Sequence, residues 1–166
     1  MKRIGVISDT HNCFDDALRK FLADVDEVWH AGDFGSIEIA DAIAKFKPLV
    51  GVYGNIDGGV TRIAYPEINV WNCEGMKVAM THIGGYPGRY QPAAYATIKR
   101  ARPDIFIAGH SHILKVQYDK SNDVLFINPG AAGCSGFHKV RTAVRFEIDG
   151  CDIRNMEIGE WPKTFC

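Results

Sequence analysis

Seven side chains that could bind metal ions occur in five short motifs of the 166-residue sequence. Each motif directly follows a short apolar run that is typical of a β-strand. The set comprises two carboxylates, four imidazoles and one amide, from Asp9, His11, Asp33, Asn55, His82, His110 and His112. Nitrogen and oxygen donors without a thiolate suit Mn²⁺, Fe²⁺, Co²⁺, Ni²⁺ or Zn²⁺. Because one ion usually takes roughly four to six donors, we interpret the seven as a two-metal centre.

The spacing and charge of these residues indicate what such a centre would do. His110 and His112 are separated by one residue, which allows one imidazole for each ion. Asp33 has two carboxylate oxygens and could bridge ions about 3.5–4 Å apart, the usual spacing in two-metal hydrolytic sites. Two dications opposite two aspartates leave a net charge of about +2, which favours an anionic ester as substrate. The residues therefore predict a metal-dependent phosphoesterase.

Apolar runs and helical patterns define the elements that must position these side chains. The runs before the motifs are Ile4–Ile7, Val28–Ala31, Leu49–Tyr53, Val78–Met80 and Ile105–Ala108. If these strands are parallel, their carboxyl ends bring all seven side chains to one edge of one sheet, where open α/β sheets bind ligands. Helix-face spacing and flanking residues predict helices at Phe14–Ala23, Ser36–Phe46 and Pro92–Arg102.

The last third of the chain has the pattern of consecutive strands. They are predicted at Leu114–Tyr118, Val124–Asn128, Thr142–Ile148 and Cys151–Ile158. A Gly-rich turn is expected at Gly54–Gly59, and further strands near Ile68–Trp71 and Lys77–Thr81. We therefore expect a single α/β domain over residues 1–166, with a βαβαβ start and antiparallel C-terminal strands.

Composition narrows the partners and the location of the protein. A net charge of −1 argues against a broad basic surface, so we expect no stable binding of nucleic acid. No stretch approaches the roughly 20 apolar residues of a membrane span, so no membrane association is expected. The wide spacing of the cysteines predicts reduced thiols at Cys13, Cys73, Cys134, Cys151 and Cys166. These features favour a cytoplasmic protein.

The motifs D-x-H, G-D, G-N-x-D, H and G-H-x-H, in this order, resemble those of the calcineurin-like metallophosphoesterase superfamily. The short length and the run Ile127–Gly130 make the chain more similar to its small bacterial and archaeal phosphodiesterases. The resemblance covers residues 4 to about 133 and implies a two-sheet β-sandwich flanked by helices. It also implies in-line attack on phosphorus by a metal-bridging hydroxide, and hydrolysis of a small or nucleotide-like phosphodiester.

The resemblance further implies a division of the ligands between two divalent metal ions, expected to be Mn²⁺, with Ni²⁺, Co²⁺, Fe²⁺ or Zn²⁺ as alternatives. Asp33 would bridge the two ions. The first ion would take Asp9, His11 and His112, and the second would take Asn55, His82 and His110.

One departure from the family pattern bears on the substrate. Many members have a histidine directly after the motif asparagine, where it can protonate the leaving group, and this chain has Ile56. General acid catalysis contributes about 10²–10⁴-fold, so its loss predicts a preference for good leaving groups such as aryl esters. Members without this histidine are more often diesterases, which favours a phosphodiesterase. The next residue, Asp57, could orient a ligand or a water, or could be an ordinary turn residue.

Other residues are candidates for substrate contact or packing. In the loop Ile83–Tyr90, Arg89 could bind a phosphate oxygen, and Tyr86 and Tyr90 could stack on a base or an aromatic leaving group. The alternative is a flexible surface loop with a solvated arginine. We expect His30 to pack behind the site and not to bind metal. His138 matches no motif and is expected to be solvated or to make a local loop contact.

Two other functions stay open at this stage. A phosphomonoesterase would share the metal site and differ only in the pocket. The same fold occurs in a scaffold subunit of the retromer coat, which works by protein contacts and has a degraded metal site. A scaffold function of this kind predicts that some metal ligands are lost. In this sequence all seven ligand positions have a side chain that can bind metal, which favours an enzyme with a small-molecule phosphoester substrate. The aromatic tail at residues 161–166 could mediate self-association into a homo-oligomer.

Overall fold

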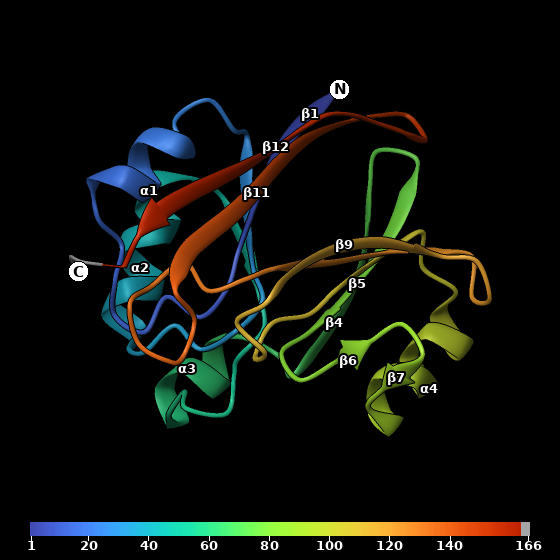
Figure 1. The fold of residues 1–166 in the computed structure, drawn as a ribbon, viewed down its shortest axis with the longest axis horizontal. Coiled ribbons are helices and arrows are strands. Elements are labelled where there is room, and N and C mark those ends of the chain that lie inside the picture. The colour runs from blue at the N-terminus through green and yellow to red at the C-terminus, as the bar shows by residue number, and fades with distance from the viewer. Residues whose placement is uncertain (164–166) are drawn as a thin grey trace.

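Two five-stranded β-sheets face each other in the computed structural model, which describes residues 1–163 (Figure 1). The first sheet has the order β12-β11-β1-β2-β3, with β1 at Lys2–Ile7, β2 at Glu27–His30, β3 at Leu49–Gly51, β11 at Val140–Asp149 and β12 at Asp152–Pro162. The second has the order β4-β5-β8-β10-β9, with β4 at Ile68–Cys73, β5 at Met76–Thr81, β8 at Ile105–Ile107, β9 at Leu114–Asp119 and β10 at Val124–Pro129. The chain therefore has the two-sheet α/β architecture that the family resemblance implies.

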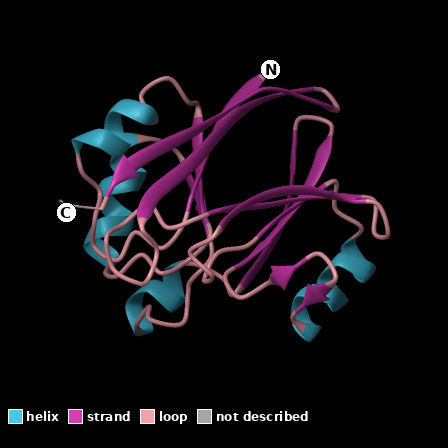
Figure 2. Ribbon diagram, in the orientation of Figure 1, coloured by secondary structure: helices cyan, strands magenta, loops and turns pink. Residues whose placement is uncertain are grey.

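Helices cover the outer faces of the two sheets (Figure 2). They are α1 at Asp16–Phe21, α2 at Ile37–Phe46, α3 at Gly59–Ala64 and α4 at Pro92–Ala101. Leu18 of α1 and Ile43 of α2 pack against Val28 on the first sheet. On the second sheet, Ile98 of α4 packs against Phe106. Helices α1 and α2 are the crossovers that join the parallel strands β1, β2 and β3, so the predicted βαβαβ start is confirmed.

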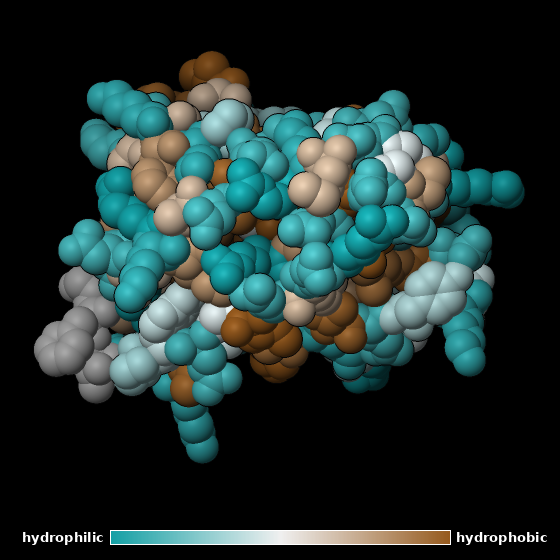
Figure 3. Space-filling view, turned by 90° about the horizontal axis from the view of Figure 1, so that it is seen from above, coloured by the Kyte–Doolittle hydropathy of each residue, from teal (hydrophilic) through white to brown (hydrophobic). Residues whose placement is uncertain are grey.

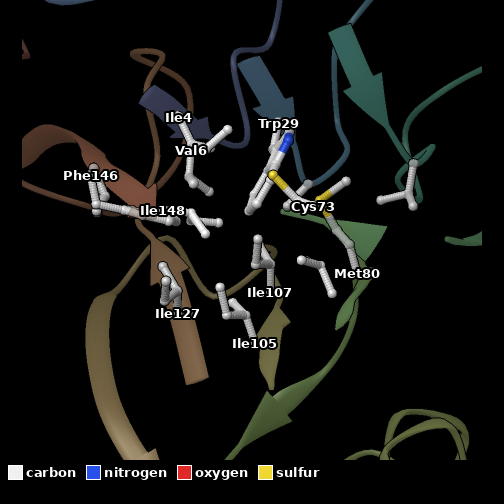
Figure 4. Close-up of a cluster of buried hydrophobic side chains, with 14 residues drawn as sticks. Ile4, Val6, Trp29, Cys73, Met80, Ile105, Ile107, Ile127, Phe146 and Ile148 are labelled. Carbon is white, nitrogen blue, oxygen red and sulfur yellow. The ribbon is translucent and has the colours of Figure 1, made fainter. Parts of the chain in front are cut away.

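The main core lies between the two sheets (Figure 4). Successive side chains of a strand point to opposite faces, so Ile4 and Val6 of β1 enter this core while Ile7 faces the helices. Trp29 of β2 is completely buried and contacts Phe146 of β11 edge to face, with ring centroids 5.9 Å apart. Because the core fixes the sheets against each other, it also fixes the strand ends of one sheet relative to those of the other.

The structure corrects one expectation about elements and adds two short elements that the sequence did not predict. The motif-bearing strands do not share one sheet: β1, β2 and β3 lie in the first sheet, and β5 and β8 lie in the second. A short helix, α3, directly follows the expected Gly-rich turn. The loop after β5 contains a short hairpin of two strands with two residues each, β6 at Gly85–Tyr86 and β7 at Arg89–Tyr90.

The surface and the cysteines complete the description. Hydrophilic side chains cover most of the face seen in Figure 3, and apolar side chains form small separate patches there. No helix within residues 1–163 is long and apolar enough to cross a membrane. Cys13, Cys73 and Cys151 are free, as expected, whereas Cys134 is disulfide-bonded, so the expectation of a reduced thiol was wrong at this residue. The predicted self-association tail extends beyond the described residues at 164–166.

Candidate metal centre

The carboxyl ends of five strands, three from the first sheet and two from the second, meet at one place and carry the predicted ligands. Six of the seven form two groups, within which the ligand atoms lie within 4.8 Å of one another. The groups are Asp9, His11 and His112, and Asp33, His82 and His110. The seventh, Asn55, is next to the second group, with its Oδ1 3.0 Å from Nδ1 of His110. The structure thus brings all seven residues together.

The two groups are neighbours because His11 and His82 each face both carboxylates. Nε2 of His11 lies 3.7 Å from Oδ1 of Asp9 and 3.5 Å from Oδ2 of Asp33. Nε2 of His82 lies 3.8 Å and 3.2 Å from the same two oxygens. Two imidazole nitrogens and two carboxylate oxygens therefore converge on a common point.

A fit to cations is indicated by nitrogen atoms that have no hydrogen-bond partner. Nε2 of His11 and Nε2 of His82 are buried, and neither makes a hydrogen bond within the described residues. A buried polar atom without a partner costs about 1–3 kcal/mol, which coordination would remove. Since the surrounding donors are carboxylate oxygens and imidazole nitrogens, the residues fit divalent first-row metal ions.

The hydrogen bonds behind two histidines fix which nitrogen faces the centre. Nδ1 of His82 lies 2.7 Å from the carbonyl oxygen of Ala31. A carbonyl oxygen only accepts, so Nδ1 carries the proton and Nε2 keeps its lone pair. Second partners of this kind orient metal-binding imidazoles and raise their basicity.

The same reasoning applies to His112 through His138. Nε2 of His138 lies 2.8 Å from the carbonyl oxygen of Gly133 and must donate to it. Nδ1 of the neutral His138 then accepts from Nδ1 of His112 at 3.1 Å, so Nε2 is the nitrogen of His112 that faces the centre, where it donates to Oδ1 of Asp9 at 3.1 Å and a metal ion would take the place of its proton. Sequence analysis expected only a solvated residue or a local loop contact at His138, and its one signal is an extra histidine after the Gly-rich loop at residues 130–136.

The carboxylates and imidazoles of the centre shift one another's protonation. Burial alone would raise the pKa of Asp9, but His11 and His112 outweigh it and hold the pKa well below its usual range. The same balance, with His11 and His82 as partners, lowers the pKa of Asp33. In return, Asp33 and Asp9 raise the pKa of His11 from 6.5 to about 9. A cation that binds here would therefore displace a proton from His11.

Asp57 is buried and holds two ligand-bearing loops by their backbone. Its Oδ2 accepts from the N–H groups of Asp33, Phe34 and Gly54 at 3.0, 3.3 and 2.7 Å. Its Oδ1 accepts from Gly35 N–H at 3.1 Å. Asp57 thus orients the loops that carry Asp33 and Asn55 through their backbone, a role that differs from both roles left open by the sequence.

Five of the seven residues have left-handed backbone conformations. The φ angles are 53° at Asp9, 44° at His11, 60° at Asp33, 69° at His110 and 61° at His112. This region is uncommon for residues other than glycine, although Asp and His enter it more readily than most. The turns direct these side chains out of the strand ends toward the centre. Gly54 is needed beside them because a Cβ there would overlap Oδ1 of Asp33.

Comparison with known proteins places the chain in a family. The family described as the calcineurin-like phosphoesterase superfamily domain matches residues 1–150. The chain belongs to this superfamily. A protein of Methanothermobacter thermautotrophicus named a probable metallophosphoesterase is 31% identical over 134 residues, which is 77% of this chain and 76% of that protein.

Solved structures of the same fold include a predicted phosphoesterase and a vacuolar sorting protein. The predicted phosphoesterase from Streptococcus pneumoniae has a TM-score of 0.69 at 23% identity, over 98% of this chain and 90% of that one. Vps29 of Entamoeba histolytica, solved in complex with Zn²⁺, has a TM-score of 0.71 at 20% identity, over 98% and 99% of the two chains. These likenesses confirm the metallophosphoesterase fold expected from the motifs.

Behind the centre of this phosphoesterase, His30 packs as expected. It is completely buried, its ring stacks on Phe34 with centroids 3.8 Å apart, and burial lowers its pKa to about 3. Its Nδ1 accepts from Gly32 N–H at 3.0 Å, so its Nε2 donates to the Thr10 hydroxyl at 2.9 Å. Both nitrogens are occupied, so His30 is not available as a ligand.

The other candidates for substrate contact lie in the hairpin β6–β7, and their surroundings differ. Tyr90 donates a hydrogen bond to Asp119 and packs against Phe106, so its hydroxyl and one side of its ring are already engaged within the protein. Arg89 lines a shallow cavity with Tyr95 and Asp119, away from the seven ligand side chains, and its phosphate role stays a prediction. Tyr86 is 42% exposed and is the aromatic residue of this loop that remains accessible.

Proposed function

We propose that this metallophosphoesterase hydrolyses phosphodiesters at a centre of two divalent metal ions held by the seven predicted ligands. The observation that carries the proposal is the convergence of two buried aspartates with His11 and His82, whose Nε2 atoms lack any other partner within the described residues. Metal ions bound here would act as Lewis acids on the phosphoryl oxygens and would activate water for attack.

The residues of the chain would hold and orient these ions. Asp33 would bridge, because histidines that face both groups lie within 3.5 Å of its Oδ2. His82 and His112 would bind through Nε2, since their Nδ1 atoms are committed to hydrogen bonds. Asn55 would add a neutral oxygen to the second ion. Mn²⁺ is our proposed metal, and the Zn²⁺ complex of the Entamoeba Vps29 supports zinc as an alternative.

A diester with a good leaving group fits the rim of the centre best. Ile56 is 45% exposed directly after the ligand Asn55, where it can neither donate nor accept a proton. A substrate whose leaving group departs as a stable anion would not need a proton there. This supports aryl and similar phosphodiesters over simple alkyl esters. The cytoplasmic location, the lack of nucleic-acid binding and the homo-oligomer stay predictions.

The proposal is tested by metal content together with turnover. The protein is stripped with a chelator, reloaded with Mn²⁺, and assayed with bis(p-nitrophenyl) phosphate and with p-nitrophenyl phosphate. About two bound ions per chain and faster turnover of the diester are expected. Faster turnover of the monoester would establish the phosphomonoesterase instead.

A protein-interaction scaffold is the second candidate, favoured by the fold likeness to Vps29 structures. The presence of all seven donor side chains argues against it, because a scaffold has no need of buried, partnerless imidazole nitrogens. Absence of both metal binding and turnover with Mn²⁺, Ni²⁺, Co²⁺ and Zn²⁺ would favour the scaffold over the enzyme.

A further inference from the structure

A mostly apolar cavity with a volume of about 390 Å³ lies next to the metal centre. It is placed between the hairpin β6–β7 and the strands β9 and β10. Its walls include Tyr86, Ser111, Ile113, Lys115, Phe126 and Asn128. None of the assigned functions uses this cavity.

The walls of the cavity continue the segments that carry the ligands. Tyr86 follows His82 by four residues, and Ile113 follows His112 directly. Because an extended chain spans at most about 3.6 Å per residue, the cavity lies within about 15 Å of both ligand backbones. The side chain of Asn128 fixes the loop between cavity and centre by donating to Gly109 O and Ser111 Oγ, each at 3.0 Å. Ser111 lines the cavity and lies between the candidate ligands His110 and His112, so a substituent of a phosphoester at the metals would be directed toward the cavity.

The cavity is suited to a flat aromatic group. Tyr86 and Ile113 remain 42% and 66% exposed, so apolar surface is available at its edge, and the fully buried Phe126 forms part of its lining. Lys115 holds its ammonium 5.3 Å from the centroid of the Tyr86 ring, which places a positive charge beside the aromatic face. The lining contains no carboxylate, so an anionic phosphoester with an aromatic substituent would meet no repulsion there.

The position of the cavity indicates which substituent it receives. The residue that would face the leaving group, Ile56, belongs to the loop after β3 in the first sheet, whereas the cavity is lined by residues of the second sheet and its loops. The two substituents of a diester would thus point to different sides of the centre.

We propose that the cavity binds an aromatic ring, from an aryl group or a nucleobase, on the substituent that stays attached to phosphorus. This inference rests on the proposed diesterase function. It makes the protein selective for diesters whose retained group is flat and aromatic, independently of the leaving group.

The test uses two substrates with the same leaving group, p-nitrophenyl phenyl phosphate and methyl p-nitrophenyl phosphate, and the Mn²⁺-loaded protein. The wild type is expected to have about tenfold higher kcat/KM for the phenyl ester, because part of the ring leaves water. Tyr86→Ala and Ile113→Ser should bring this ratio close to one, mainly through KM. Tyr118→Ala is the matched control, since Tyr118 is an exposed aromatic residue on β9 that does not line the cavity, and it should keep the ratio.

The outcomes separate this inference from the proposed function. Equal kcat/KM for both esters in the wild type, or an unchanged ratio in both cavity variants, would overturn the inference and leave the diesterase intact. If the metal-loaded wild type hydrolysed neither ester, the proposed function would be overturned and the inference with it. Calorimetric titration with phenyl phosphate and methyl phosphate adds a readout without turnover, and tighter binding of the phenyl compound only in proteins with Tyr86 and Ile113 is expected.

Discussion

The buried carboxylate of Asp57 offers a sharp test of how the centre is assembled. In Asp57→Ala, four backbone N–H groups lose their acceptor, and three of these bonds are buried. Each buried donor left without a partner costs about 1–3 kcal/mol, but water and loop relaxation recover part of this. We therefore expect a loss of about 3–5 kcal/mol in the free energy of unfolding.

Asp57→Asn should lower the free energy of unfolding much less than Asp57→Ala, so the two variants can be compared directly. One amide oxygen can replace Oδ2, which receives three of the four bonds, while the amide N–H₂ then opposes only the Gly35 N–H. A loss of about 1–2 kcal/mol is expected. Both variants would be measured by urea unfolding of chelator-treated protein. As control, Asp152→Ala removes an exposed carboxylate paired with Arg154 and should cost under about 1 kcal/mol. A loss below 1 kcal/mol in Asp57→Ala, or equal losses in Ala and Asn, would refute the reasoning.

Three further predictions concern the centre itself. Asp33→Ala should weaken Mn²⁺ binding at both sites and His82→Ala mainly at one; equal loss at both sites in each variant, by calorimetric titration, would contradict the division of ligands. His138→Phe removes the acceptor of His112 Nδ1 and should weaken metal affinity about 10–100-fold, with partial recovery in His138→Gln, whereas unchanged affinity would show that His138 does not orient its neighbour. The pKa of His11 is raised from 6.5 to about 9, so the stability that it adds is fully present below pH 6.5 and is lost as pH rises through about 9. The urea concentration at the midpoint of unfolding of the metal-free protein should accordingly be lower at pH 9.5 than at pH 6.5. If a His11→Gln variant showed the same pH dependence as wild type, the assignment of this effect to His11 would be refuted.

Local patterns predicted the strands well because most are short apolar runs that end at charged or glycine residues. They failed for α3, which begins at Gly59 and has only six residues. Glycine is a poor helix former, so the helix depends on contacts outside its own backbone bonds, and Arg62 supplies a local one by donating to the carbonyl oxygen of Asp57 at 2.7 Å. Tyr65, which follows the helix, adds a ring contact to Phe34 at 5.0 Å. The contact between Tyr65 and Phe34 links segments far apart in the chain and leaves no periodic signal.

The seven candidate ligands could be picked out because each follows a strand, whereas their surroundings could not be predicted. The expectation of one sheet was wrong, since periodicity identifies a strand but does not say which sheet it joins. His138 was missed as a partner of His112 because the two lie 26 residues apart and meet only when the loop after β10 folds back. Asp57 was left undecided for a similar reason, as its partners at residues 33–35 belong to another loop.

The left-handed turns at the ligand positions bear on how such a centre could be lost. Each nonglycine residue in this region costs of order 1–3 kcal/mol, less for Asp and His. Once metal binding is no longer under selection, substitutions such as His110→Gly would relax the backbone instead of damaging the fold. A lineage of this architecture that abandons catalysis would therefore relieve backbone strain wherever a left-handed ligand outside the Asp9–Asp33–His11 ion pairs is replaced by glycine. For the same reason, substitutions taken from relatives that lack the metal site could raise heat resistance, but they would remove the residues proposed to bind metal.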